Sequence, residues 1–564
     1  MKWKLLLLLF INLLQAQTDY PKDYFRSPLD IPLSLSGNFG ELRSNHFHSG
    51  LDFRTQQKEG LNVYASADGY IARIKISSFG NGKTIYINHP NGYTTVYCHL
   101  SKTNAIIDQY IKAIHYKRES YEIEVFPGTT ELTVKKGDII AFSGNSGGSG
   151  GPHLHFEIRN TKTEQIINPL LFGFDKMIPD SRKPILTSLL VYPLSDNTVV
   201  NESQKPVLVN MVQQSDGSYT SEKVLANGKI GFGIVAYDVF DRAFGKNGIY
   251  KIATFSNGNP SFSFQFDRFT FDETRYINAL LDYPRLVGMG AKVQKLFMVN
   301  PYKLSIINTG QENGILDIQP NLSYTYKIEV ADFNNNKVVV NVPIAYADVP
   351  AKVLKKEEKK GYFLNSNNDN NYKKDNVTVF IPAKTFYEDF YINFDVKNDT
   401  LILHNNIVGV HNTMAITFLD TTASEADKQK MFIATINNKK IKYNPTRRNG
   451  VEFITYTKNL GRFALAKDTV APVVLPVNFK EGLWLTKQTG LVFTISDALS
   501  GIKEYKGYLN GKWVLFEYDY KTRKMVHDFD DAFLTDGKND IKVIVTDNVG
   551  NSTIFESYFY RKSN

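Results

Sequence analysis

Residues 144–158 read GNSGGSGGPHLHFEI, a glycine-rich loop that leads through a proline into an alternating pattern. In a strand, residues i and i+2 point to the same face, so His153 and His155 are expected to project together. Leu154 and Phe156 then point to the opposite, apolar face. Two buried imidazoles need polar partners, which makes the pair costly as packing. A metal ligand beside an acid/base or oxyanion-stabilising group would explain both histidines.

The glycines of residues 144–151 predict a tight turn rather than a phosphate site. A phosphate-binding loop would carry a lysine after its glycines, and none follows here. Glycine lets the backbone approach a substrate chain closely, because it has no Cβ atom. Such a turn would also deliver His153 to the site.

The stretch HSGLD at residues 48–52 places an imidazole and a carboxylate four residues apart. Zinc accepts nitrogen and oxygen ligands at about 2.0–2.2 Å in tetrahedral geometry, so His48 and Asp52 can both reach one ion. This spacing is common by chance when it stands alone. However, seven of the ten histidines lie within residues 46–155, so chemistry based on imidazole is expected near the N-terminus.

Residues 94–100 read TTVYCHL and predict a further strand. Neighbouring residues face opposite sides of a strand, so Cys98 is expected in the core rather than as a nucleophile or ligand. His99 on its own would more often be a structural histidine. His46 could contact substrate, but a role in local structure is favoured.

These three stretches, in this order, resemble the lysostaphin/LytM-type zinc metalloendopeptidases. The resemblance covers about residues 30–170 and rests on HSGLD, VYCHL and GNSGGSGGPHLHFEI together. It implies a compact antiparallel β domain of the duplicated hybrid motif type. It also implies Zn²⁺ as cofactor, held by three ligands: His48, Asp52 and His155. His153 and His99 match the two catalytic histidines of the family that are not ligands.

The resemblance implies a zinc-dependent endopeptidase that hydrolyses peptide cross-links of bacterial peptidoglycan in cell-wall remodelling. Three protein ligands leave a fourth zinc position for water, as in catalytic sites. His153 is expected to help deprotonate this water and His99 to stabilise the oxyanion, although the two roles can be exchanged. Two alternatives stay open. One is a non-catalytic envelope regulator that activates another wall hydrolase, and the other is a secreted protease of glycine-rich proteins.

Residues 1–16 are expected to be a signal peptide, since Lys2 and Lys4 precede a largely apolar run that ends near Ala16. The run is too short for a permanent transmembrane helix, which needs about 20 apolar residues. We therefore expect an exported protein, periplasmic, envelope-associated or extracellular, with no transmembrane segment after cleavage. Peptidoglycan is the expected partner. Other envelope proteins are candidate partners of the C-terminal modules, and no nucleic acid is expected.

The chain has 564 residues, which is too long for one hydrophobic core. Aromatic residues make up 13% and favour strands, so a mostly β fold is expected, with β-sandwich (Ig-like) modules after the catalytic domain. Beyond the signal peptide we expect a zinc endopeptidase domain at 17–178, a β-sandwich module at 179–348, a β-rich module at 349–467 and an Ig-like β-sandwich at 468–564.

Short alternating segments after residue 179 predict strands, for example at residues 337–342, 377–381 and 542–546. Two regions resemble each other: Asp332 leads to Asn336 as Asp547 leads to Asn551. Two related sandwich modules would explain this likeness, as would chance recurrence of turn residues.

The sequence supports a prediction for each of three further places in the chain. Residues 110–127 look longer than the matching segment of typical family members and are expected to form a flap beside the groove. Such a flap could hold the enzyme latent. The charge run at residues 355–360 is expected to be a linker, and Trp513 is expected in the core of the last module.

Overall fold

The structure is a computed structural model that describes residues 19–355, 360–437, 440–529 and 533–562. The expected signal peptide at residues 1–16 and most of the charge run at residues 355–360 lie outside the described residues. Strands predominate in the described part and helices are few, which confirms the predicted mostly β fold class. No helix among the described residues is long and apolar enough to cross a membrane.

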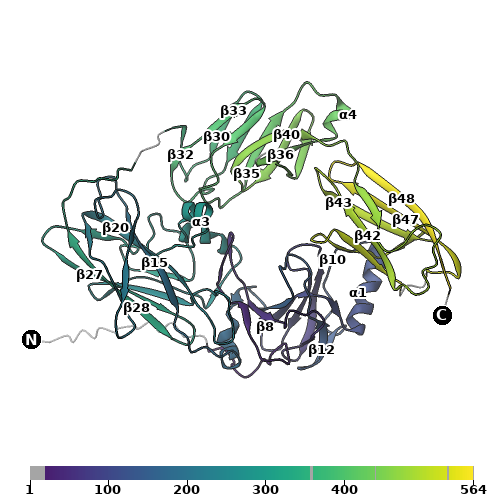
Figure 1. The fold of residues 1–564 in the computed structure, drawn as a ribbon, viewed down its shortest axis with the longest axis horizontal. Coiled ribbons are helices and arrows are strands. Elements are labelled where there is room, and N and C mark those ends of the chain that lie inside the picture. Colours follow the sequence, from purple (N-terminus) through teal and green to yellow (C-terminus); the bar gives the residue numbers. More distant parts are fainter. Residues whose placement is uncertain (1–18, 356–359, 438–439, 530–532, 563–564) are drawn as a thin grey trace, which may run out of the picture.

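The first part of the chain folds around one large antiparallel sheet (Figure 1). Its strands lie in the order β1 (Leu35–Gly37), β4 (Leu51–Arg54), β13 (His153–Asn160), β8 (Tyr93–Leu100), β7 (Lys83–Asn88), β6 (Gly69–Ile76) and β10 (Ile123–Val125). A smaller sheet shares the same apolar core and consists of β5 (Asn62–Tyr64), β12 (Ile139–Phe142) and β9 (Lys102–Thr103). β8 confirms the strand predicted at residues 94–100. Because β4, β13 and β8 are neighbours, the three sequence motifs meet at the centre of the large sheet.

The segment predicted as a flap folds as a helix and an edge strand. Helix α1 (Ala105–Arg118) begins at its N-cap Asn104 and buries Ile107 and Ile111. β10 then pairs with β6 at the edge of the large sheet. Among the described residues, none that lines the cleft beside the candidate site comes from residues 110–127. The prediction of a flap is therefore wrong, because Ile111, Ile123 and Val125 anchor this segment in the core of the domain.

The second part of the chain is a β-sandwich whose core continues that of the first part. Its main strands are β15 (Ile185–Pro193), β20 (Gly228–Tyr237), β21 (Lys251–Ser256), β27 (Ser323–Ala331) and β28 (Lys337–Tyr346). β28 includes the strand predicted at residues 337–342. The short strand β23 (Arg268–Phe269) pairs with β14 (Ile166–Ile167) of the first part. Phe269 also contacts Phe39 and Phe47, with ring centroids 4.9 and 5.7 Å apart, so the two parts share one hydrophobic unit.

The third part has an apolar core of its own. One antiparallel sheet consists of β30 (Asn370–Lys374), β31 (Val377–Ile381), β35 (Met414–Leu419), β39 (Glu452–Thr457) and β38 (Thr446–Asn449). The other consists of β33 (Phe394–Lys397), β34 (Thr400–Leu403), β40 (Gly461–Lys467), β36 (Met431–Asn437) and β37 (Lys440–Tyr443). β31 confirms the strand predicted at residues 377–381. Arg275 of the second part donates to the carbonyl oxygen of Val410 at 2.7 Å and so connects the two parts.

The fourth part is a second sandwich with a separate core. Its sheets consist of β41 (Val473–Pro476), β42 (Gly490–Ser496), β46 (Lys524–Asp528) and β45 (Glu517–Asp519), and of β44 (Lys512–Val514), β43 (Ile502–Leu509), β47 (Gly537–Asp547) and β48 (Ser552–Arg561). β41 pairs with β42 as β15 pairs with β20. β43, β47 and β48 pair in sequence as β21, β27 and β28 do. The shared pairing supports two related sandwich modules, and β47 includes the strand predicted at residues 542–546.

The chain follows a curved path that brings the fourth part back to the first (Figure 1). Lys83 forms an ion pair with Glu517 at 2.8 Å. Trp513 contacts Tyr116 of α1, with ring centroids 5.1 Å apart. Trp513 is buried, but it is not part of the apolar cluster that the described residues of the last module form. The prediction that it packs in that core is wrong, because its ring is covered by the first part of the chain.

Candidate metal centre

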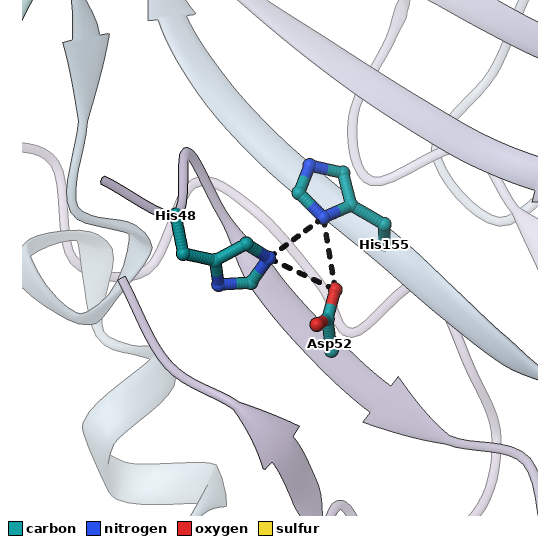
Figure 2. A group of neighbouring side chains, drawn as sticks. All are labelled: His48, Asp52 and His155. Atoms are coloured by element: carbon teal, nitrogen blue, oxygen red, sulfur yellow. Dashed lines mark hydrogen bonds and ion pairs between the residues drawn. The ribbon is translucent and has the colours of Figure 1, made fainter. Parts of the chain in front are cut away.

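Neighbouring strands of the large sheet bring the three predicted ligands together (Figure 2). Asp52 in β4 is directly paired with His155 in β13. His48 lies in the connection between β3 (His46–Phe47) and β4. Each of the three residues is only 6% exposed. The side chains point toward one another from the loop and the two strands, as Figure 2 shows.

The candidate ligand atoms form a small triangle. His48 Nε2 lies 3.0 Å from Asp52 Oδ1 and 3.0 Å from His155 Nδ1. His155 Nδ1 lies 2.9 Å from Asp52 Oδ1. Ligands of a tetrahedral zinc ion at about 2.0–2.1 Å would stand about 3.3 Å apart, so the triangle needs only a slight expansion to hold one. Two imidazole nitrogens and a carboxylate oxygen are also donors that zinc accepts, and the group can hold a metal ion.

His48 is oriented by its second ring nitrogen. Nδ1 lies 2.7 Å from the carbonyl oxygen of Asn38, which accepts a hydrogen bond and therefore fixes the proton on Nδ1. The lone pair is then on Nε2, which faces the metal centre. Metal-ligating histidines commonly use such a contact to set tautomer and ring orientation.

His155 is oriented by a buried chain of charged groups. Its Nε2 lies 2.9 Å from Glu157 Oε1, so this nitrogen donates and Nδ1 faces the metal centre. Ser49 Oγ donates to the same carboxylate at 2.6 Å, and Arg159 Nε donates to Glu157 Oε2 at 2.6 Å. Burial disfavours the Glu157 carboxylate, but Arg159 and His155 outweigh it and lower its pKa to about 2.

Asp52 uses its two oxygens for different partners. Oδ1 faces the two histidine ligands, whereas Oδ2 accepts a hydrogen bond from Arg43 Nη2 at 3.0 Å. Arg43 also bonds Glu41 at 3.1 Å, so its guanidinium is shared by two carboxylates. Asp52 is therefore arranged to bind a metal through one oxygen.

The protonation of the metal-free centre is shifted toward an ion pair. Burial opposes the charging of His155, but hydrogen bonds to Asp52 and Glu157 overcome it and raise its pKa to about 9. Burial also works against the Asp52 carboxylate, yet the neighbouring histidines hold its pKa well below the ordinary value. A proton therefore lies on His155 at neutral pH until a metal takes its place.

The two predicted catalytic histidines lie next to this triangle. His153 Nε2 is 3.5 Å from Asp52 Oδ1, and the ring centroids of His153 and His99 are 4.8 Å apart. His99 comes near the end of β8 with a positive φ of 60°, and its Nδ1 lies 2.9 Å from the carbonyl oxygen of Ser146. Burial and the neighbouring imidazoles lower the pKa of His99 to about 3, so its ring is neutral. The structure brings all five predicted site residues together.

A cleft of about 570 Å³ opens beside the centre. Its lining includes Asp52 and His153 from the site, Arg43 and Arg54, and residues 150–152 at the end of the glycine-rich loop. A peptide lying in this cleft would reach Asp52 and His153 and meet two guanidinium groups.

The glycine-rich loop is held from two sides. Gly147 has a φ of +69°, and a Cβ atom there would come within 2.3 Å of the backbone nitrogen of Gly82. Lys521 of the last module donates hydrogen bonds to the carbonyl oxygens of Asn145 and Ser149. The wall of the cleft thus depends on the first and the last part of the chain.

Sequence reasoning missed the residues that orient the ligands. Glu157 and Arg159 follow His155 at intervals of two residues. Strand periodicity could therefore have predicted that they lie on the same face of β13 as His155. Asn38 and Arg43 had no such signal, because only the folded chain places them beside the ligands. His46 is exposed, and its Nδ1 lies 2.9 Å from the carbonyl oxygen of Ser44, a contact that fits a role in local structure.

Comparison with known families assigns two parts of the chain. Residues 46–115 and 122–169 match the profile of Peptidase family M23. This part of the chain is a peptidase M23 domain. All five site residues fall within the matched ranges, and the resemblance to lysostaphin/LytM-type enzymes is confirmed. Residues 361–468 match a second profile, the Zu5-like domain, which sequence reasoning did not identify.

Several bacterial proteins are similar to part of this chain. An uncharacterized metalloprotease of Haemophilus influenzae is 33% identical over 26% of this chain and 27% of that protein. The DD-carboxypeptidase/endopeptidase Mpg of Neisseria meningitidis is 33% identical over 23% of each chain. The peptidoglycan DD-endopeptidase ShyA of Vibrio cholerae is 32% identical over 24% of this chain and 26% of that protein. The chain thus spans about a quarter of the length of these relatives.

Proposed function

We propose that this protein is a zinc-dependent endopeptidase that hydrolyses peptide cross-links of bacterial peptidoglycan. The observation that carries the proposal is the convergence of His48 Nε2, Asp52 Oδ1 and His155 Nδ1 beside an open cleft. The M23 domain supports a metallopeptidase, and relatives named as peptidoglycan DD-endopeptidases support the substrate class.

His48, Asp52 and His155 would hold the zinc ion and leave one position toward the cleft. When bound, zinc supplies a water of lowered pKa and polarises the scissile carbonyl. The protein keeps both histidine ligands in the required tautomers through Asn38 and Glu157. Arg43 binds the second oxygen of Asp52 and so keeps the carboxylate from turning away.

The hydrogen bonds of the two remaining histidines give both rings the same tautomer. His99 Nδ1 donates to the Ser146 carbonyl oxygen at 2.9 Å, and His153 Nδ1 donates to the Gly151 carbonyl oxygen at 2.9 Å. Each neutral ring therefore presents a lone pair on Nε2, which can accept a proton and, once protonated, can donate to the oxyanion of the tetrahedral intermediate. We propose His153 as the base and His99 as the group that stabilises the oxyanion, and the two roles can be exchanged.

The charge of the cleft favours stem peptides over glycine-rich proteins. Arg54 lines the cleft, and a guanidinium group binds carboxylates in paired, directional contacts. Peptide stems that carry free carboxylates would use these contacts, whereas a run of glycines would not. A secreted protease of glycine-rich proteins is thus the weaker alternative, and a non-catalytic regulator would leave the complete site without a role.

The location of the substrate extends the proposal to the rest of the chain. Peptidoglycan lies outside the cytoplasmic membrane, so the protein would be exported by the signal peptide at residues 1–16 into the periplasm or envelope. The domain at 17–178 would carry the catalytic site. The parts at 179–348, 349–467 and 468–564 would then position the enzyme on the wall or on other envelope proteins.

The proposal is tested by digestion of purified peptidoglycan, with the products identified by mass spectrometry. We expect loss of cross-linked muropeptides, abolition of this activity by a zinc chelator and its recovery when zinc is added back. A glycine-rich polypeptide incubated in parallel should remain intact. Cleavage of the polypeptide with intact sacculi would favour the protease alternative, and cleavage of neither substrate by the zinc-loaded protein would contradict the proposed activity.

A matched pair of variants separates chemistry from folding. His99→Ala should retain zinc and lose turnover, whereas His46→Ala should retain both, because His46 is exposed and bonded to Ser44. Equal turnover by the two variants would remove His99 from the mechanism.

A further inference from the structure

Two clusters of aspartates lie outside the M23 site. Asp180, Asp238 and Asp332 form the first, with carboxylate oxygens within 4.8 Å of one another. The second cluster consists of Asp468, Asp497 and Asp547, whose carboxylate oxygens also lie within 4.8 Å of one another. Three carboxylates at such distances repel one another unless a cation or protons compensate their charge.

The two clusters occupy equivalent places in the two sandwich modules. Asp180 and Asp468 each stand four residues before a proline that precedes the first strand, Pro184 before β15 and Pro472 before β41. Asp238 directly follows β20, and its counterpart Asp497 directly follows β42, the strand that pairs with the first.

The third aspartate completes the correspondence. Asp332 directly follows β27, and Asp547 is the last residue of β47. Each accepts hydrogen bonds from the backbone nitrogen and the side-chain amide of the asparagine four residues later, at 2.8 and 2.7 Å. Asn336 and Asn551 each also donate to the carbonyl oxygen of the first aspartate of their module. The same arrangement therefore occurs twice in one chain.

The first cluster contains a buried carboxylate oxygen that lacks a partner. Asp238 is 1% exposed, and its Oδ1 has no hydrogen-bond partner among the described residues. Burial and the charges of Asp180 and Asp332 raise its pKa to about 8. Burial and Asp332 likewise raise the pKa of Asp180 to about 7. A cation between the three carboxylates would remove both the repulsion and the missing contact.

The second cluster is more deeply enclosed. Asp468 and Asp547 are 1% and 0% exposed. Ser500, which is 2% exposed, donates its backbone nitrogen to Asp468 Oδ2 at 3.0 Å. Its side-chain Oγ has no partner within the described part of the chain. Here too, a buried oxygen without a hydrogen-bond partner belongs to a residue that contacts the cluster.

We propose that each sandwich module binds one Ca²⁺ ion through its three aspartates. All the available ligands are oxygens, which suit hard cations and not the nitrogen and sulfur preference of zinc. Ca²⁺ accepts irregular geometry with carboxylate, carbonyl and water ligands, whereas Mg²⁺ requires a near-ideal octahedron. The ion would tie the segment that enters each module to the ends of two of its strands.

The first calcium site would also support the M23 site. Asp238 begins the loop that leads to Gly248, and Gly248 exchanges two hydrogen bonds of 2.8 Å with the side chain of Asn38. Asn38 in turn accepts the hydrogen bond from His48 Nδ1. Fixing this loop would fix the carbonyl that orients a zinc ligand.

Calcium titration of the zinc-loaded full chain tests the proposal by calorimetry, with metal content measured after removal of free ions. Wild type should bind one Ca²⁺ per cluster. Asp238→Asn and Asp497→Asn should each lose one ion, and the double variant should lose both while its zinc content is unchanged. Asp216→Asn, an exposed change in the first module, is the matched control and should bind as wild type does.

A second measurement covers variants that fold poorly. The unfolding temperature of wild type should rise with the concentration of free Ca²⁺, because a ligand that binds only the folded state stabilises it. Mg²⁺ at the same concentration should have a smaller effect. The proposal is overturned if wild type binds no Ca²⁺, if Mg²⁺ binds in its place, or if the double variant binds as much Ca²⁺ as wild type.

Discussion

His48 and His155 present opposite ring nitrogens to the metal centre, Nε2 from one and Nδ1 from the other. The difference is explained at the scale of single residues. A carbonyl oxygen of Asn38 holds the proton on Nδ1 of His48, and the Glu157 carboxylate holds it on Nε2 of His155. Under the proposed function, the residues beside the candidate ligands contribute to metal affinity because they fix the tautomer and orientation of each ring.

Glu157→Gln tests this dependence. The change removes the negative charge that pairs with both His155 and Arg159, and we expect zinc affinity to fall about 10- to 100-fold. Competition with a chromogenic chelator measures the affinity. Glu164→Gln is the matched control, because Glu164 bonds the same arginine but is exposed. Equal affinities of the two variants would show that Glu157 does not position His155.

Zinc binding should release protons. Because hydrogen bonds to Asp52 and Glu157 raise the pKa of His155 to about 9, the metal-free ring is protonated at neutral pH. Zinc requires the lone pair on Nδ1, so binding at pH 7 should release about one proton, and affinity should rise with pH up to about 9. Calorimetry in buffers of different ionisation enthalpy measures this release. Binding heats that do not depend on the buffer would contradict the prediction.

At the scale of elements, the site depends on the pairing of β4, β13 and β8 and on the loop before β13. The common face of His153 and His155 could be predicted from the sequence, because strand periodicity is local. The fold of residues 110–127 could not, since whether an insertion covers the groove or packs as α1 depends on contacts made after folding. The contact of Trp513 with Tyr116 was unpredictable for the same reason, as it joins residues far apart in the chain.

Gly147→Ala tests the rigidity of the loop. Its φ of +69° and the Gly82 backbone within 2.3 Å of the added Cβ should cost about 1–3 kcal/mol and lower the unfolding temperature. Gly150→Ala in the same loop is the control, since a Cβ atom there meets nothing within 4 Å. Equal unfolding temperatures for the two variants would show that the loop adapts freely.

At the scale of the whole molecule, the last module returns to the first and contacts the loop that borders the cleft (Figure 1). The Lys83–Glu517 ion pair and the contact of Tyr520 with Phe79 lie on the same interface. The position of the loop is therefore coupled to the docking of a module more than 300 residues later in the sequence.

Lys521→Ala tests this coupling. Loss of the hydrogen bonds to Asn145 and Ser149 should increase amide hydrogen exchange in residues 144–151 without changing zinc content. Lys524→Ala, in β46 of the same hairpin, should leave the exchange unchanged. An unchanged rate in both variants would mean that the module does not restrain the loop.

The central claim is that His155 holds a catalytic zinc ion beside His153, which is not a ligand. The most direct test compares wild type, His155→Ala and His153→Ala for zinc content and peptidoglycan turnover in the same preparations. We predict that His153→Ala retains zinc and loses turnover, and that His155→Ala loses both. Full zinc content and turnover in His155→Ala would contradict the account.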